Sequence, residues 1–316
     1  MDHPSDSFGS GADAPAVSVV LTTFNRSALL TRAIESVLAQ TLDDFELVVV
    51  DDCSTDDTTE VLSRIDDPRV SSIRHETNLG LASARNSGIR RARGRFVCFL
   101  DDDDELLPDK LSAQATAFDN EDEPDRVLVY TQAVVDDGIS SNVKPRRPLR
   151  EREPLSEYLM CGEGALPIHS LMVTRKLVRD TMFAPGERRF EDYSWLLGLE
   201  ALGVKFVLLE RPLVVWHAEL QRIRLSRSIS FEEAGRWLDS RGPAITPRAR
   251  KAFLAREVAP FVEKRGSRAR IARAIAVAVF TGSIPLSEGF KSVLKATLPP
   301  SMLYQLRRLL PRSRFG

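Results

Sequence analysis

The chain has 316 residues, of which 43% are hydrophobic and 28% charged, and its 44 Lys and Arg nearly balance its 45 Asp and Glu. This composition is typical of a globular enzyme and excludes a disordered chain, and the net charge of −1 argues against a general nucleic-acid binder. Cys53, Cys98 and Cys161 are too few and too scattered for a disulfide framework or a cysteine-ligated zinc site, which favours a reducing, cytoplasmic compartment.

Neither a signal peptide nor a membrane-spanning segment is predicted. Residues 1–15 contain acids, small residues and Pro but no basic or apolar run, so we expect a disordered tail. No window reaches the roughly 18 unbroken apolar residues that a spanning helix needs.

The N-terminal part of the chain alternates apolar, β-branched runs with segments of helical periodicity. We expect strands at Val17–Leu21, Phe45–Val50, Val70–His75 and Arg95–Leu100, and helices at Leu29–Leu38, from Ser54 or Thr55 to Ile65, and at Leu81–Arg93. Strands that are apolar nearly throughout are buried on both faces, and alternation with helices implies parallel crossovers. The sequence therefore predicts a doubly wound α/β sheet.

The following segments extend this pattern and then change it. We expect helices at Pro108–Phe118 and Asp192–Leu202, a mobile loop at Asn142–Pro154, and strands at Arg126–Val135, Ile168–Val173, Val204–Leu209 and Leu213–Trp216. Beyond about Ser230 the pattern is mainly helical. We therefore expect one α/β domain over residues 16–229 and a helical, basic region over residues 230–316.

Three polar clusters follow predicted strands: Thr22, Phe24 and Arg26 after the first, Asp51 and Asp52 after the second, and Asp101–Asp104 after the fourth. In an open parallel sheet, ligands bind outside the carboxyl ends of the strands, so topology brings these clusters to one edge. For Asp51 and Asp52 alone, a simple turn is an equal alternative.

Four adjacent carboxylates at Asp101–Asp104 are the strongest signal for a bound cation. Such close like charges raise one another's pKa values unless a cation compensates them, and oxygen-rich sites suit Mg²⁺ or Mn²⁺. In extended backbone Asp101 and Asp103 share a face while Asp102 points away, which would let one pair serve a metal and Asp102 a ribose. A solvated acidic turn is the alternative.

Four blocks of the sequence together resemble those of glycosyltransferase family 2: VSVVLTTFNR, VVVDDCSTDDT, NLGLASARNSGIRRARGRFVCFLDDDDELLPDKL and RRFEDYSWLLGLE. The resemblance covers about Ala16 to His217. It implies the GT-A fold, a Rossmann-like, mostly parallel doubly wound sheet, here with a helical C-terminal extension. Residues 16–120 or so would form the nucleotide-binding half and residues 121–229 the acceptor half.

The resemblance also implies a role for each strand-end residue. Thr22, Phe24 and Arg26 would border the nucleobase, Asp52 would bind the base or ribose, Arg85 would lie near the diphosphate, and Asp102 near the ribose. Asp103 would be the principal ligand of Mn²⁺ or Mg²⁺, assisted by Asp101. Asp192, beside Glu191, would be the general base. The family more often has Ala or Ser at the position of Asp102.

Four further residues are candidates with a structural alternative beside each. His217 ends a predicted strand and is expected either to complete the metal shell or to be structural. His169, Glu191 and Trp195 are candidates for acceptor binding. A half-buried polar residue is at least as good an interpretation of His169, and core packing is the safer interpretation of Trp195. Arg222, Arg224 and Arg227 would close over the diphosphate or lie in a solvated loop.

These features predict a metal-dependent, inverting glycosyltransferase that moves a sugar from a nucleotide-diphospho-sugar, a UDP-sugar by preference, to a saccharide or lipid-linked acceptor. A nucleotidyltransferase is the first alternative, but the loop after Leu21 lacks the Gly-rich, Lys-bearing pattern of that class. A receiver-type phosphoacceptor module would place its acidic pair where Thr22 and Thr23 stand. A nucleotide-sugar-binding pseudoenzyme is the third alternative.

The C-terminal region is strongly basic, whereas the rest of the chain is acidic. From Val262 onward, eleven Lys and Arg stand against two Glu, a formal charge of +9, which leaves −10 for the rest of the chain. Apolar and basic residues mix over Ile271–Phe280 and Leu298–Phe315, as they do in interfacial helices. Peripheral contact with the inner face of the plasma membrane, a helical cap on the catalytic domain, and a homodimer contact remain as three interpretations.

Overall fold

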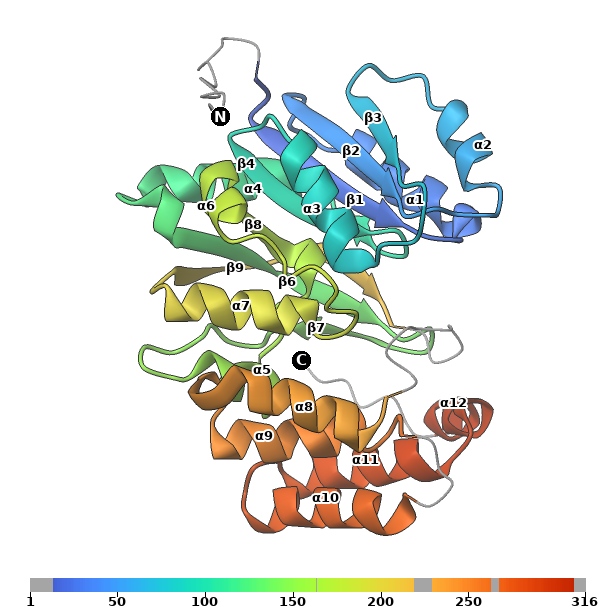
Figure 1. Cartoon of the computed structure of the whole chain (residues 1–316), viewed down its shortest axis with the longest axis vertical. Helices are drawn as coiled ribbons and strands as arrows, with labels where there is room; N and C mark the ends of the chain where they lie inside the picture. Colours follow the sequence, from blue (N-terminus) through green and yellow to red (C-terminus); the bar gives the residue numbers. More distant parts are fainter. Residues whose placement is uncertain (1–13, 163, 219–228, 263–266, 310–316) are drawn as a thin grey trace, which may run out of the picture.

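The structure is a computed structural model, and it describes residues 14–162, 164–218, 229–262 and 267–309 (Figure 1). In chain order, the main elements are β1 (Val17–Thr23), α1 (Ser27–Leu38), β2 (Phe45–Asp51), α2 (Thr58–Ser63), β3 (Val70–Arg74), α3 (Leu81–Arg91), β4 (Phe96–Asp101), β5 (Glu105–Leu106), α4 (Lys110–Ala117), β6 (Val127–Asp136), β7 (Ser141–Lys144), α5 (Leu155–Met160), β8 (Leu171–Thr174), α6 (Arg175–Asp180), α7 (Glu191–Ala201), β9 (Lys205–His217), α8 (Phe231–Arg241), α9 (Pro247–Phe253), α10 (Arg268–Phe280), α11 (Leu286–Thr297) and α12 (Pro300–Leu309).

One sheet of nine strands organises the molecule, in the order β3-β2-β1-β4-β8-β6-β9-β5, with β7 beside β6. The stretch β3-β2-β1-β4 is wholly parallel, as predicted, whereas β8 is antiparallel to both of its neighbours. The α/β fold is confirmed, and the sheet becomes mixed beyond β4. Because β1, β2 and β4 run in the same direction, their carboxyl ends lie at one edge.

Alternating side chains of each central strand enter two different cores. Val19 and Leu21 face the layer that contains Leu30 and Ile34 of α1, whereas Val20 faces the layer of α3. Burial on both faces explains why these strands are apolar nearly throughout. A side chain at Gly88 of α3 would lie 2.3 Å from Val20 Cγ1, so glycine allows this helix to approach β1 closely.

The C-terminal helices continue one of these cores. Trp237 of α8 and Phe253 of α9 contact Phe190 at ring-centroid distances of 4.8 and 5.0 Å, and Trp237 Nε1 donates to Ser194 Oγ at 2.9 Å. The helical region therefore packs on the α5–α7 side of the sheet (Figure 1). None of the helices in the described part of the chain combines the length and the apolar character that a membrane crossing requires.

Four local predictions are wrong. The strand expected from Ile168 starts only at Leu171, because Ile168–Ser170 form a 3-10 turn, and the two strands expected between Val204 and Trp216 are the single strand β9. The helix after β2 begins at Thr58, because Ser54 and Thr55 instead bind the loop that follows β1. Part of the expected loop at 142–154 is strand β7, since β6 extends to Asp136 and offers it a pairing edge. The expected disordered tail lies almost entirely outside the described residues.

Candidate active site

The register of the central strands brings the predicted polar clusters together. Thr23 of β1 pairs with Asp51 of β2, and Thr22 pairs with Asp101 of β4. Asn25 Oδ1 accepts a hydrogen bond from Thr55 N at 2.7 Å, which joins the loops after β1 and β2. Asn25 and Cys53 both have positive φ, of 52° and 70°, so both loops hold a non-glycine residue in the left-handed region. Such strain concentrates at functional sites.

Asp52 is buried at this edge and organises the segment before α3. Its carboxylate accepts hydrogen bonds from Leu79 N at 2.9 Å and Gly80 N at 2.8 Å, and it contacts His75 Nδ1 at 2.7 Å. His75 Nε2 lies 2.9 Å from Ser87 Oγ. His75 is a site residue that the sequence did not indicate, although it ends a predicted strand. The base- or ribose-binding role of Asp52 stays a prediction.

Arg26 bridges two members of the aspartate quartet, which comprises Asp101 to Asp104. One guanidinium nitrogen, Nη1, lies 3.0 Å from Asp102 Oδ1 and 3.0 Å from Asp103 Oδ2. The chain turns directly after β4, so Asp102 and Asp103 reach the same cation. The expectation that Asp102 points away while Asp101 and Asp103 share a face is therefore wrong, because the backbone there is not extended.

Asp102 is held in an environment that disfavours its charge. Burial raises its pKa to about 7, although Arg26 and the hydroxyl of Thr23, which donates to Asp102 at 2.8 Å, act in the opposite direction. Asp101 and Asp103 add to the rise. Additional positive charge would reduce the repulsion among these neighbouring carboxylates, so the site favours the binding of a divalent cation.

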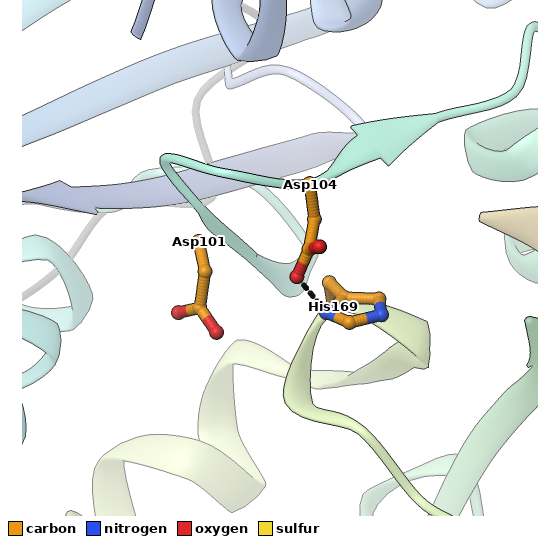
Figure 2. A group of neighbouring side chains, drawn as sticks. All are labelled: Asp101, Asp104 and His169. Carbon is orange, nitrogen blue, oxygen red and sulfur yellow. Dashed lines mark ion pairs between the residues drawn. The ribbon is translucent and has the colours of Figure 1, made fainter. Parts of the chain in front are cut away.

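A second group of ligand-type side chains lies on the other side of the quartet. Asp101, Asp104 and His169 each offer an atom within 4.8 Å of the others, and His169 Nδ1 lies 2.9 Å from Asp104 Oδ2 (Figure 2). Carboxylate oxygens with an imidazole suit Mn²⁺ and related divalent ions. His169 is buried in this group, and its expected role in acceptor binding stays a prediction.

Of the three predicted metal ligands, only Asp101 belongs to this Asp–Asp–His group. Asp103 instead contacts Arg26, and His217 Nε2 lies 2.6 Å from Glu105 Oε1. The backbone N–H of His217 donates to Asp104 Oδ1 at 2.9 Å, so the end of β9 supports the quartet. The ligand roles of Asp103 and His217 stay predictions.

Arg85 of α3 links the quartet to the start of α7. It is 3% exposed, and its two terminal nitrogens lie 3.0 Å from Asp101 Oδ1 and 3.0 Å from Glu191 Oε1. Burial opposes its charge, but Asp101 and Glu191 outweigh that cost and raise the pKa of Arg85. Its predicted contact with a diphosphate stays a prediction, and its observed role is to fix these two carboxylates.

Asp192 lies next to this bridge at the first turn of α7. The preceding residue, Phe190, has a φ of 61°, which sets the abrupt entry into the helix. Burial and then the neighbouring Glu191 raise the pKa of Asp192 to about 7, although Arg85 opposes the rise. A carboxylate with such a pKa can accept a proton near neutral pH.

Two other predicted site residues differ in their exposure. Phe24 is 41% exposed at the end of β1, where a flat ligand can reach it, whereas Thr22 is buried in the strand. Arg222, Arg224 and Arg227 lie outside the described residues.

Trp195 is a core residue, as its safer interpretation predicted, and its role in acceptor binding stays a prediction. Its ring packs edge-on to Phe99 at 5.8 Å and beside Phe183 at 4.9 Å, and its Nε1 donates to Thr181 Oγ1 at 3.3 Å. It lies on the inner face of α7 and is 5% exposed, so little of the ring is open to an acceptor.

Trp195→Ala is expected to lower the free energy of unfolding by about 3 to 5 kcal/mol, because it leaves a cavity between α7 and the sheet. Urea unfolding measures this change. Leu202→Ala, at an exposed position directly after the same helix, is the control and should change stability by less than about 0.5 kcal/mol. An unchanged unfolding midpoint for Trp195→Ala, with a raised KM for an acceptor, would support the acceptor role.

The mixed α/β sheet, with its polar strand ends gathered at one edge, has the GT-A fold. A model of glycosyl transferase family 2 matches residues 18–183. The amylovoran biosynthesis glycosyltransferase AmsB of Erwinia amylovora is 31% identical over 238 residues, which cover 73% of this chain and 79% of AmsB. The chain therefore belongs to glycosyl transferase family 2 and is a glycosyltransferase.

Two other similar proteins are informative. The UDP-Glc:alpha-D-GlcNAc-diphosphoundecaprenol beta-1,3-glucosyltransferase WfaP of Escherichia coli is 35% identical over 105 residues, 33% of this chain and 42% of WfaP. The mannosyltransferase PcManGT of Pyrobaculum calidifontis, solved with GDP-Man and Mn²⁺, superposes with a TM-score of 0.55 at 18% identity over 97% of this chain and 87% of PcManGT. At that identity the second likeness shows the fold alone.

Proposed function

We propose that this glycosyltransferase moves a sugar from a UDP-sugar to a saccharide or lipid-linked acceptor, with inversion at the anomeric carbon, in the synthesis of an envelope polysaccharide. The observation that carries the proposal is the position of Asp192, which adjoins Glu191 and so lies beside the Glu191–Arg85–Asp101 bridge to the aspartate quartet. Burial there raises the pKa of Asp192 to about 7, which supports a role as a base. The family assignment decides against a nucleotidyltransferase and a receiver module.

In the proposed reaction Asp192 accepts the proton of an acceptor hydroxyl. The hydroxyl oxygen attacks the anomeric carbon from the face opposite the diphosphate, the anomeric C–O bond breaks, and the nucleoside diphosphate leaves with the bonding electrons. Attack opposite to the leaving group inverts the configuration. Such general-base assistance contributes about 10²- to 10⁴-fold to the rate.

The aspartate quartet has the donor chemistry for Mn²⁺ or Mg²⁺, and Asp101 to Asp104 with His169 are the residues that would hold the ion. A divalent cation bound there supplies electrostatic stabilisation of the charge on the departing diphosphate. Arg26 contacts Asp102 and Asp103 and would have to share these carboxylates with the ion. The proposed ion is Mn²⁺.

The names of two relatives support the proposed acceptor and site of action. AmsB is named for amylovoran biosynthesis and WfaP for a diphosphoundecaprenol acceptor, which supports a glycan that is assembled on a lipid carrier. Such an acceptor would be presented at the cytoplasmic face of the plasma membrane. The proposal therefore includes peripheral membrane contact; a homodimer stays a prediction.

We expect UDP-sugars with Mn²⁺ to raise the melting temperature of the protein, while GDP- and dTDP-sugars raise it much less. A ligand that binds only the folded state at about 100 times its Kd stabilises that state by about 2.7 kcal/mol. Thermal unfolding with a panel of UDP-, GDP- and dTDP-sugars, with and without Mn²⁺, measures the effect. Stabilisation by GDP-sugars alone would move the proposal to another donor class, and indifference to every donor would remove it.

A further inference from the structure

Large apolar side chains gather on the outside of the C-terminal helices. Seven of the eleven exposed large hydrophobic residues in the described ranges lie on α10, α11 and α12: Val277, Phe280, Leu286, Phe290, Val293, Met302 and Leu306. Phe280 is 90% exposed, Leu286 75% and Phe290 63%. A soluble protein rarely exposes so many large apolar groups in one place without a partner for them.

Helix α11 shows that this exposure is built into the packing. Its inward face consists of Gly289, Ser292 and Ala296, which are buried, whereas Leu286 and Phe290 point outward one turn apart. A Cβ at Gly289 would lie 2.4 Å from Val279 Cγ2, so the small inward residues let α11 lie directly against α10. The helix therefore presents its largest apolar side chains to the exterior.

Basic side chains accompany this apolar face. Arg273 precedes Val277 by one turn on α10, and Lys291, which pairs with Glu288 at 2.6 Å, adjoins Phe290 on α11. The region from Val262 onward has a formal charge of +9, whereas the remainder of the chain has −10. Figure 1 shows α10 to α12 at the end of the long axis opposite β1–β3. An anionic surface would thus attract this end of the molecule and repel the other.

We propose that the outer face of α10, α11 and α12, defined by Phe280, Leu286 and Phe290 with their basic neighbours, binds the surface of an anionic phospholipid bilayer. The apolar side chains enter the boundary between head groups and acyl chains, and the cations bind lipid phosphates. This inference rests on the lipid-linked acceptor of the proposed function, and it identifies the surface by which the enzyme would reach that acceptor at the membrane. A second copy of the chain is the competing occupant.

Flotation of the full-length protein with vesicles tests the surface separately from sugar transfer. Binding is expected to vesicles with about one third phosphatidylglycerol and to be much weaker with phosphatidylcholine alone. The triple variant F280S/L286S/F290S should bind the anionic vesicles at least about tenfold more weakly. The control, L202S/V143S, removes two exposed apolar side chains elsewhere and should bind as the parent does.

Thermal unfolding and the molar mass in solution complete the experiment. The triple variant should keep the parent melting temperature and donor-induced stabilisation, because its three side chains are exposed and remote from the aspartate quartet. Equal vesicle binding by parent and triple variant, or no binding by the parent, would overturn the proposal. A parent dimer that the triple variant converts to a monomer, without vesicle binding, would assign the face to self-association instead. If no nucleotide sugar raises the melting temperature of the parent, the proposed function is refuted, and the result with vesicles still stands by itself.

Discussion

Replacing Asp192 by Asn is expected to lower kcat for sugar transfer by about 10²- to 10⁴-fold while leaving the donor Kd unchanged. Asn has nearly the same shape as Asp but does not accept the acceptor proton. The Arg85–Glu191 contact at 3.0 Å is made without the Asp192 side chain, and an asparagine oxygen can still accept the hydrogen bond from Tyr193 N in the first turn of α7. Initial rates with saturating donor and acceptor, and donor binding measured by calorimetry, separate the two effects.

Asp119→Asn is the matched control, because Asp119 is an exposed carboxylate on the opposite side of β4 from α7 and has no place in the proposed mechanism. It should retain the parent kcat. Near-native turnover by Asp192→Asn would show that another group removes the proton.

The pH dependence of the parent enzyme carries the same information. Asp192 acts as a base only when ionised, and its pKa is about 7 rather than the ordinary 3.8. The logarithm of kcat should therefore fall by about one for each pH unit below 7.

The effect of Asp192 on the free energy of unfolding has the opposite pH dependence. Its raised pKa means that the folded state binds this proton more tightly than the unfolded state does. Asp192 therefore costs stability as the pH rises from 4 toward 7, and Asp192→Asn should flatten that slope.

Replacing Asp103 by Asn is expected to weaken Mn²⁺-dependent binding of the nucleotide sugar by more than about 100-fold. Asp103 and Asp102 both contact one guanidinium nitrogen of Arg26, so this pair of carboxylates already binds a cationic group and would share it with a divalent ion. Loss of even an outer-shell partner of a metal typically costs 10- to 100-fold in affinity, and a direct ligand costs more. Calorimetric titration of the donor with and without Mn²⁺ measures the change.

Asp104→Asn is the informative companion variant. Asp104 accepts the His217 N–H at 2.9 Å and pairs with His169, so its removal should first lower the melting temperature. If Asp104→Asn abolishes the Mn²⁺ effect while Asp103→Asn retains it, the ion belongs to the Asp101–Asp104–His169 group and the role of Asp103 is wrong.

The sequence predicted the edge of the sheet well because each element there has a strong local signal. Buried strands read as β-branched runs, and the polar residues that end β1, β2 and β4 had to meet once the strands were parallel. His75 obeys the same rule at the end of β3 and was overlooked only because one strand-end histidine is a weak signal by itself.

Contacts between residues that are far apart in the chain could not be predicted from local sequence patterns. Arg85 and Glu191 are 106 residues apart, and Asp104 and His217 are 113 apart, so no local pattern indicates that they meet. Both interpretations of Trp195 stayed open for a related reason: the sequence fixes its place on α7 but not which face the neighbouring Phe183 and Phe99 cover. The division of labour among Asp101 to Asp104 depends on a sharp turn that extended-strand geometry does not predict.

The central claim is that the aspartate quartet, Asp52 and Arg85 surround a single nucleotide-binding crevice that holds a divalent cation. Anomalous diffraction from crystals grown with UDP and Mn²⁺ tests it most directly. We predict one manganese peak within about 2.0 to 2.6 Å of carboxylate oxygens of Asp101–Asp104, with the UDP phosphates beside it. An ordered UDP with no manganese at the quartet, or a manganese peak bound elsewhere in the molecule, would contradict the claim.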